Sequence, residues 1–324
     1  MSIRVIKKGL LDTIQDQGRY GYQHLGINPC GVMDTVAMRI ANALTGNTAH
    51  TPVLEIHFPG PVLSFETDAI IAISGADFSA KLNNDLSIPI NRCVAVKAGS
   101  QLSFQKQITG ARAYIAVHGG FQTEQWLNSA ATHMGLSSVG TLLQNEMLLP
   151  IKKIIQVSEN KIHSWSAISP VVEKDLVIRY TAGHEINRLN DTMQAVLHDH
   201  SFTIDKSSNR MGYRLQGPSL IPDTTSEILS AAVTRGTIQL LPNGQLIILM
   251  ADHQTTGGYP RIGHIITADF SKLAQLNAGA CFQLQQVSLS EAHQALQAQE
   301  LHLKQLETGC KLRIADSRSQ MSDI

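Results

Sequence analysis

The stretch from residue 53 to residue 120 is a succession of short apolar runs, and this pattern constrains the fold more than any other feature of the sequence. The runs are rich in valine, isoleucine and alanine, and turn-forming pairs such as Pro59-Gly60, Asn84-Asp85 and Thr109-Gly110 separate them. Buried strands have this length and composition, whereas helices need longer stretches with a repeat of about 3.6 residues. The pattern predicts a β-sandwich or a β-barrel.

The length of the chain indicates more than one domain. A chain of 324 residues exceeds what one hydrophobic core usually supports, so two domains are expected, with one large β domain as the alternative. In each half a strand containing a glutamate, Glu55 or Glu227, precedes a glycine and two further strands, which suggests two related β domains. By composition, residues 151–174 are the best candidate for a linker. We place the first domain at residues 1–165 and the second at residues 166–324.

A few segments carry the pattern of helices. Residues 34–44 repeat apolar side chains at helical spacing, with Asp34 as the expected N-cap and Gly46 as the stop. Residues 187–197 are a second candidate, and residues 288–306 form an amphipathic pattern that begins at a serine cap. The sequence therefore predicts a mainly β protein with a few helices.

The charge composition excludes several classes of partner. The 26 lysines and arginines balance the 26 aspartates and glutamates, and no basic block is present, so neither nucleic acid nor a membrane surface is an expected partner. The N-terminal residues lack the apolar run of a signal peptide, and no stretch approaches the length of a transmembrane helix. We expect a cytoplasmic protein.

The cysteines and histidines do not form a metal site by spacing. The four cysteines are scattered without CxxC spacing, which fits reduced structural thiols. The cluster His198-Asp199-His200 lacks further ligands at a suitable distance along the chain, so no metal is expected.

Two polar, glycine-rich loops contain the candidate site residues. Residues 249–263 follow an apolar strand and contain an acid, an amide, hydroxyls and a phenol. Residues 13–34 are similar in design, and an ordered surface loop is the alternative interpretation there. Complementary donors and acceptors so close together favour ligand binding or a subunit contact. The candidates are Asp252, Gln254, Thr255, Thr256 and Tyr259 in the first loop, and Gln15, Asp16 and Arg19 in the second.

Three charged residues have more than one interpretation. Arg210 and Arg214 are four positions apart, and on a strand they would share a face and converge on one anion; the alternative is two solvated arginines. Asp252 is the candidate general base, if its surroundings raise its pKa. Glu55 lies in an apolar strand, where alternation favours a solvent-facing side chain over a buried carboxylate that needs a partner.

The motifs of several enzyme classes are missing from the sequence. It contains no GxxxxGK[ST] phosphate loop, no GxSxG nucleophile elbow and no HExxH zinc motif. An autonomous ATPase, serine hydrolase or metalloprotease is therefore not supported. Any reaction is expected to need a partner chain.

Several longer motifs carry a resemblance to a known family. The segments TIQDQGRYG, GVMD, IANALTGN, SSNRMGYRL, EILSAAVTRGTIQL and MADHQTTGGYPRIG occur in this order. The chain resembles, over nearly its whole length, the biotin-dependent carboxyltransferase family that includes allophanate hydrolase subunit 2, the KipA-type proteins and the C component of bacterial 5-oxoprolinase. The resemblance implies two tandem cyclophilin-like β-barrel domains.

The resemblance also implies an activity and partners. Such proteins act with a KipI-like B component and a LamB/YcsF-like A component, and together they cleave 5-oxoproline to L-glutamate with ATP and its magnesium ion. A second branch transfers carboxyl groups from biotin to urea, and a third alternative is a regulator that binds a KipI-like kinase inhibitor without turnover. A small amide or lactam is the implied substrate.

The resemblance assigns roles to residues of both loops. It implies catalytic roles for Asp252 and Arg210, and the substrate-binding residues are Gln15, Asp16, Arg19, Arg214, Gln254, Thr255, Thr256 and Tyr259. Two positions depart from the usual pattern of the family. Asn209 stands where an acid is usual, and His253 stands where an arginine is usual.

Overall fold

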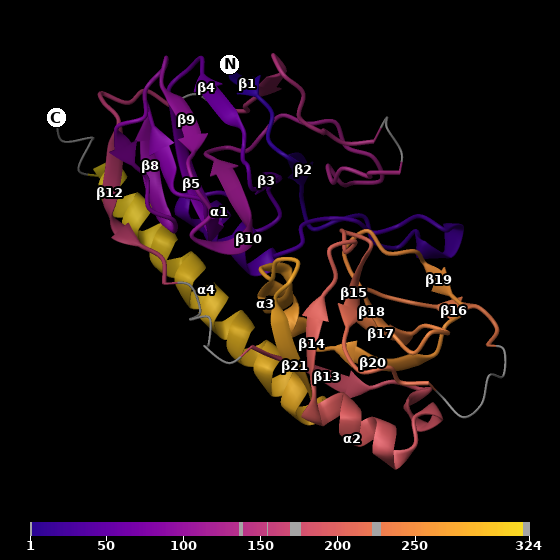
Figure 1. Cartoon of the computed structure of the whole chain (residues 1–324). Coiled ribbons are helices and arrows are strands. Elements are labelled where there is room, and N and C mark those ends of the chain that lie inside the picture. The colour runs from indigo at the N-terminus through magenta and orange to yellow at the C-terminus, as the bar shows by residue number, and fades with distance from the viewer. Residues whose placement is uncertain (1, 136–138, 154, 169–175, 222–227, 320–324) are drawn as a thin grey trace. The chain divides into compact units, whose positions relative to one another are not determined.

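The computed structural model divides the chain into two compact units (Figure 1). It describes all residues except 1, 136–138, 154, 169–175, 222–227 and 320–324. The first unit contains Met1–Gly18, Asp34–Pro170 and Glu300–Ile324, and the second contains Arg19–Met33 and Val171–Gln299.

The first unit contains two antiparallel sheets of six strands each. One sheet has, in spatial order, β11 (Leu148–Pro150), β1 (Ser2–Lys7), β4 (Val62–Phe65), β9 (Gln101–Phe104), β6 (Ala80–Leu82) and β7 (Leu86–Ser87). The other has β12 (Lys161–Ser166), β8 (Arg92–Val96), β5 (Ala69–Asp77), β10 (Thr109–Val117), β3 (Val53–His57) and β2 (Thr13–Gln15).

Side chains of both sheets share one hydrophobic core. Val5 and Leu63 from the first sheet pack in the same cluster as Ile56 and Ile73 from the second. Helix α1 (Thr35–Leu44) contacts β5 and β10, so these two strands are buried along most of their length. The unit is therefore a two-sheet sandwich with a helix against one sheet.

The second unit contains a closed barrel and a small sheet. The barrel strands, in spatial order, are β13 (Val177–Ala182), β20 (Arg261–Ile265), β17 (Thr237–Leu240), β18 (Leu246–Leu249), β15 (Gly212–Gln216), β14 (Ser201–Ile204) and β21 (Cys281–Gln286). The small sheet pairs β16 (Ala231–Ala232) with β19 (Thr256–Gly257). The parallel pairing of β13 with β21 closes the ring.

Alternation along the barrel strands determines which side chains fill the barrel. Tyr213 and Leu215 of β15, Ile248 of β18, and Ile238 and Leu240 of β17 belong to one buried core. Helix α2 (Asp191–Asp199) contacts β21, and helix α3 (Phe270–Ala274) contributes Leu273 and Ala274 to the core. Short 3-10 turns lie at η1 (Gln23–Leu25), η2 (Ile186–Arg188) and η3 (Thr267–Asp269).

The helices confirm the helical patterns of the sequence. The Asp34 carboxylate accepts a hydrogen bond of 2.9 Å from the amide of Ala37, as expected of the N-cap of α1. Helix α2 lies slightly later than the predicted 187–197. Helix α4 (Leu289–Ser319) begins with a reciprocal capping box between Ser288 and Glu291, and it extends beyond the predicted end at residue 306.

The strands confirm the mainly β prediction and its barrel. In the first unit, where the apolar runs were compatible with a sandwich or a barrel, the strands form two packed sheets. The division of the chain has two features that the sequence did not suggest: Arg19–Met33 belongs to the second unit, and Glu300–Ile324 belongs to the first.

Two smaller expectations were wrong. Residues 151–174 are not simply a linker, because β12 lies within them and pairs with β8. Glu55 does not face solvent. It is fully buried on β3, between the neighbouring strands β2 and β10, and its side chain forms a hydrogen bond with Tyr114. Glu227, the matching glutamate of the second half, lies outside the described residues.

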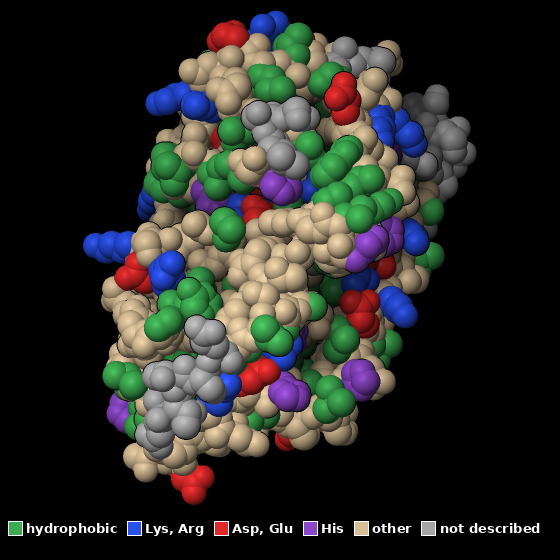
Figure 2. Space-filling view, turned by 90° about the vertical axis from the view of Figure 1, so that its right-hand side faces the viewer, with side chains coloured by type: hydrophobic (Ala, Val, Ile, Leu, Met, Phe, Trp, Pro, Cys, Tyr) green, Lys and Arg blue, Asp and Glu red, His purple; other side chains and the backbone are tan. Residues whose placement is uncertain are grey.

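The surface shows no concentration of one charge sign on the face in Figure 2, where lysine and arginine side chains are interspersed with acidic ones. Among the described residues, no helix is both long enough and apolar enough to cross a membrane.

Candidate ligand-binding site on the second unit

A row of three outward side chains crosses the barrel of the second unit. Arg214 of β15 lies opposite Ile247 of β18, and Ile247 lies opposite Gln239 of β17. Residues opposite each other on neighbouring strands project from the same face of a sheet. Because the flanking Tyr213 and Leu215 point into the barrel core, Arg214 and the rest of its row project outward.

A pocket of about 470 Å³ lies over this row. Its polar lining consists mainly of Asn209, Arg214, Gln239, Asn243, Gln254 and Tyr259. Ile247 and Leu249 of β18 supply apolar surface. The described lining residues include one guanidinium and no carboxylate, so the pocket suits a small polar ligand with a single negative charge.

Gln239 is the most unusual side chain of the pocket. It is only 1 % exposed, and its Nε2 has no hydrogen-bond partner within the described residues. A buried donor left without a partner costs about 1–3 kcal/mol. The amide reaches its position because residue 257 is glycine: a Cβ there would lie 2.5 Å from Gln239 Nε2. The pocket thus contains a hydrogen-bonding group that a ligand could satisfy.

The predicted 249–263 loop forms one wall of this pocket. Gln254 and Tyr259 line the pocket, as does Arg214. Thr255 and Thr256 do not line it but hold the loop by backbone pairing: the Val233 amide donates to the Thr255 carbonyl at 3.1 Å, and Thr256 pairs with Ala232. The loop residues therefore divide between lining the pocket and supporting it.

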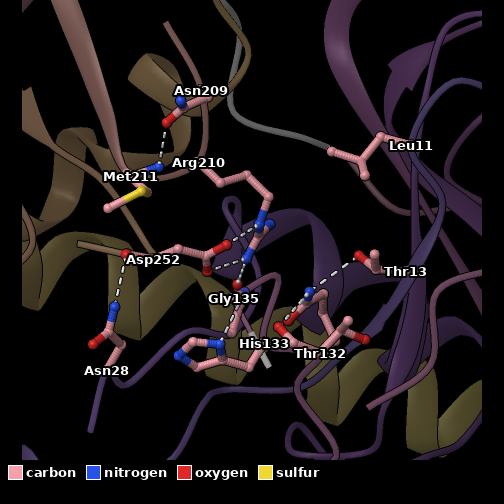
Figure 3. Close-up of polar contacts among 12 residues, drawn as sticks. Leu11, Thr13, Asn28, Thr132, His133, Gly135, Asn209, Arg210, Met211 and Asp252 are labelled. Atoms are coloured by element: carbon pink, nitrogen blue, oxygen red, sulfur yellow. Dashed lines mark hydrogen bonds and ion pairs between the residues drawn. The ribbon is translucent and has the colours of Figure 1, made fainter. Parts of the chain in front are cut away.

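Arg210 and Asp252 form a buried ion pair at the base of the same loop (Figure 3). Arg210 donates from Nε and Nη2 to the two carboxylate oxygens of Asp252, each at 2.9 Å. The Asp252 amide donates to the Arg210 carbonyl at 2.8 Å. Both side chains are buried, with 4 % of Arg210 and 7 % of Asp252 exposed. We call this arrangement the Arg210–Asp252 clamp.

The structure agrees with neither interpretation of Arg210 and Arg214, because they do not converge on one anion and Arg210 is not solvated. Arg210 precedes β15, which begins at Gly212, so the two residues do not share a strand. Arg210 is buried in the clamp, whereas Arg214 is exposed and lines the pocket. Only one of the two guanidiniums is therefore available to a ligand of this pocket.

The clamp also holds the segment Arg19–Met33. Arg210 Nη2 donates to the carbonyl of Gly31 at 2.6 Å, and Asn28 donates to the carbonyl of Asp252 at 3.0 Å. Arg19 is buried, and its amide donates to the carbonyl of Pro29 at 2.8 Å. Burial, together with the neighbouring Asp252 carboxylate, raises the pKa of the Cys30 thiol to about 12. This thiol is therefore protonated at neutral pH.

The two positions that depart from the family pattern occupy different environments. Asn209 lines the pocket, and its Oδ1 accepts a hydrogen bond of 2.8 Å from the Met211 amide. His253 is buried, and its Nδ1 donates to the Gln254 carbonyl at 2.6 Å. Burial lowers the pKa of His253 below its usual value of 6.5, so the ring is neutral at physiological pH.

Gln15 and Asp16 lie in the first unit and are buried there. Asp16 accepts hydrogen bonds from the Ser129 hydroxyl and the Ala130 amide, both at 2.7 Å, and from the Gly18 amide at 2.8 Å. Gln15 Nε2 donates to Thr13 Oγ1 at 3.0 Å and to the Thr132 carbonyl at 3.4 Å. These two residues anchor the chain around residues 129–132.

The sequence did not indicate Gln239 or Asn243 as pocket residues. Gln239 lies in the strand TIQL, where a single polar residue among apolar ones normally faces solvent. Its position next to a Gly-Gly pair in a facing loop becomes visible only in the fold. Asn243 belongs to a hairpin turn, where asparagine has an ordinary structural explanation.

The fold and the pocket define a mainly β protein with a ligand-sized polar pocket on the outer face of a closed barrel. The carboxyltransferase domain family, subdomains A and B, matches residues 25–286. The chain belongs to this family, which confirms the resemblance of its motifs.

Individual relatives are similar over nearly the whole chain. The C component of the 5-oxoprolinase of Escherichia coli (strain K12) is 37 % identical over 307 residues, which cover 94 % of this chain and 97 % of the relative. The protein of the same name from Haemophilus influenzae is 34 % identical, with 95 % and 96 % covered. The crystal structure of Kluyveromyces lactis urea carboxylase superposes with a TM-score of 0.84 at 27 % identity, covering 95 % of this chain and 29 % of that protein.

Proposed function

We propose that the chain is the C component of a 5-oxoprolinase, which acts with partner proteins to cleave 5-oxoproline to L-glutamate at the expense of ATP. The observation that carries this proposal is the 37 % identity to the C component of a 5-oxoprolinase, because the similarity covers 97 % of that relative. Similarity over a whole chain argues for the same role in an assembly more strongly than a shared domain does.

The pocket chemistry supports a substrate of this kind. 5-Oxoproline is a five-membered lactam with one carboxylate, one amide N–H and one amide carbonyl. The pocket offers the Arg214 guanidinium, neutral amides and a phenol, and its volume of about 470 Å³ exceeds what so small a ligand needs. A substrate in this pocket would bind in an environment that matches its single charge.

The residues of this pocket do not fit ATP with its magnesium ion. A triphosphate needs several cationic groups or a cradle of backbone amides, and magnesium prefers carboxylate oxygens. The described lining has one guanidinium and no carboxylate. Within the described part of the chain, no group of three or more His, Cys, Asp and Glu side chains is placed to hold a metal ion. We therefore do not expect ATP in this pocket.

The partners that the family resemblance implies complete the proposal. The KipI-like and LamB/YcsF-like components would supply the ATP site and the hydrolytic step. Within this chain, we assign Arg210 and Asp252 a positioning role, because each carboxylate oxygen of Asp252 already accepts a hydrogen bond from Arg210. Gln254 and Tyr259 are the loop residues that would contact the substrate.

Reconstitution tests the proposal. The three components are mixed with 5-oxoproline and ATP, and the release of glutamate is measured with and without this chain. We expect release only when this chain is present. Equal release after its omission would contradict the proposal, and complex formation without turnover would favour the regulator instead.

Biotin-dependent carboxyl transfer is a second candidate, favoured by the likeness to the Kluyveromyces lactis urea carboxylase. It requires a biotin-carrier partner and bicarbonate. Consumption of urea that depends on bicarbonate and on a biotinylated carrier would support this candidate. Glutamate release that is independent of both would exclude it.

A further inference from the structure

We propose that Gln239 and Arg214 bind the two ends of the substrate in the barrel pocket: Gln239 pairs with the lactam amide, and Arg214 binds the carboxylate. This inference rests on the proposed function and assigns a site and a binding mode within it. It predicts that the clamp residues Arg210 and Asp252 do not touch the substrate.

The positions of the two residues match the length of the ligand. Arg214 and Gln239 are separated by one strand, so their backbones are roughly 10 Å apart, given a strand spacing of about 4.8 Å. A guanidinium and a carboxamide that extend into the pocket from these positions leave space for one small ring between them. Ile247, the residue between them in the row, would lie beneath the ring methylenes.

The carboxamide of Gln239 is complementary to a cyclic amide. In a five-membered lactam the N–H and the carbonyl are cis and point to the same side of the ring. A glutamine side chain presents an N–H and a carbonyl in the same way, so two antiparallel hydrogen bonds can form between them. A linear amide with a trans N–H and carbonyl cannot form this pair with one side chain.

The structure leaves the Gln239 amide ready for such a partner. Its Nε2 is buried and unpartnered within the described residues, and Gly257 leaves room for it. Buried polar side chains usually have their hydrogen bonds satisfied, and because Gln239 lines the pocket, a ligand there can supply the missing partner. The carboxylate of the ligand is matched by Arg214, the one charged side chain of the described lining.

The ring of biotin carries a cyclic urea with the same cis arrangement of N–H and carbonyl. A cyclic amide is therefore the shared chemistry of both candidate functions. Arg214 favours 5-oxoproline, whose carboxylate is attached directly to the ring, whereas the carboxylate of biotin lies at the end of a long chain.

The test uses the assembled complex and two substitutions that remove the polar groups, Gln239→Met and Arg214→Met. We expect each to raise the KM for 5-oxoproline at least tenfold and to leave the KM for ATP within twofold. The matched control is Gln285→Met, an exposed glutamine of β21 outside this pocket, which should change neither KM. Thermal unfolding should show that Gln239→Met is at least as stable as the unsubstituted chain, because no hydrogen bond within the described protein is lost.

Substrate analogues separate the two contacts. Inhibition by 2-pyrrolidinone, which lacks the carboxylate, should be insensitive to Arg214→Met but weakened by Gln239→Met. Biotin should inhibit at least tenfold more weakly than 2-pyrrolidinone if the pocket is shaped for the smaller ring, and stronger inhibition by biotin would overturn the assignment to 5-oxoproline.

The outcomes distinguish this inference from the proposed function. An unsubstituted complex that releases glutamate, combined with an unchanged KM for 5-oxoproline in Gln239→Met, would overturn the inference and leave the proposed function intact. A correctly folded and assembled complex that releases no glutamate would overturn both.

Discussion

The Arg210–Asp252 clamp and the barrel pocket are neighbours, since Asn209 and Gln254, close to the clamp residues in the chain, line the pocket, yet the polar groups of the two are satisfied in opposite ways. In the clamp, the charges are buried and fully paired with each other and with backbone groups. In the pocket, the buried amide of Gln239 has an unpartnered nitrogen within the described residues, and Arg214 is exposed. Charge by itself does not mark the ligand site; a pocket-lining amide with an unmet hydrogen bond does.

The difference has an energetic origin. A buried charge must be paired to be tolerated, and once it is paired, moving it towards a ligand is costly. An unpartnered neutral amide lowers the stability of the free protein by a smaller amount and regains this energy when a ligand binds. The clamp therefore suits a role in fixing the loop, and the pocket suits recognition.

The largest expected effect tests whether the clamp stabilises the fold. Arg210→Leu leaves the Asp252 carboxylate buried and unpaired, so we expect the free energy of unfolding of the second unit to fall by about 3–5 kcal/mol. Arg214→Leu, at an exposed position, should change it by less than about 0.5 kcal/mol. Hydrogen exchange of β15 and β18 peptides, read by mass spectrometry, measures both. Similar losses of stability in the two variants would contradict the difference between a structural Arg210 and a ligand-binding Arg214.

The same contrast extends to the first unit, where Asp16 has a full set of partners. Asp16→Asn replaces an acceptor oxygen with a donor that faces other donors, and we expect a loss of about 1–3 kcal/mol in the free energy of unfolding, with no change in the KM for 5-oxoproline. Asp85→Asn, in an exposed turn, is the control. A raised KM for 5-oxoproline without a loss of stability would indicate that Asp16 contacts the substrate.

Two neighbouring glycines test whether the position of the Gln239 amide matters for substrate binding. Gly257→Ala puts a Cβ 2.5 Å from Gln239 Nε2 and should displace the amide, raising the KM for 5-oxoproline about tenfold, or about 1.4 kcal/mol. Gly258→Ala meets its nearest atom at 3.5 Å and should stay within about twofold. Steady-state kinetics of the assembled complex compares them, and equal values would show that the amide position is unimportant.

The smallest expected effect concerns pH. Burial lowers the pKa of His253 in the folded state, so protonation of the ring destabilises the fold. The contribution of His253 to the free energy of unfolding is therefore fully present above pH 6.5 and is lost as the pH falls below that value. We expect His253→Gln to reduce the slope of unfolding free energy against pH by up to about 1.4 kcal/mol per pH unit. Urea denaturation from about pH 7.5 to about pH 5 measures the slope. His184→Gln, at an exposed histidine, should leave it unchanged.

Local patterns predicted much of the fold. Strand runs between turn formers, the Asp34 cap and the serine cap of α4 depend on neighbours a few residues away, so the sequence displays them directly. The membership of Arg19–Met33 in the second unit depends on contacts such as Asn28 with Asp252, which are 224 positions apart, and no local pattern records them.

The site was predictable only in part for the same reason. The loop containing Gln254 and Tyr259 stood out because polar residues and glycines follow an apolar strand. Arg210 forms an ion pair with Asp252, 42 positions later. The spacing between Arg210 and Arg214 does not reveal this partner. Gln239 was not predicted because an outward residue of a strand is normally solvated, and here the facing loop covers it.

The most direct test of the binding mode is a crystal structure of the assembled complex with 5-oxoproline bound. We predict the lactam within about 3 Å of the Gln239 carboxamide, the carboxylate at Arg214, and the Arg210–Asp252 ion pair intact. A ligand that contacts the Asp252 carboxylate, with Arg210 turned towards the substrate and Gln239 still without a partner, would contradict it.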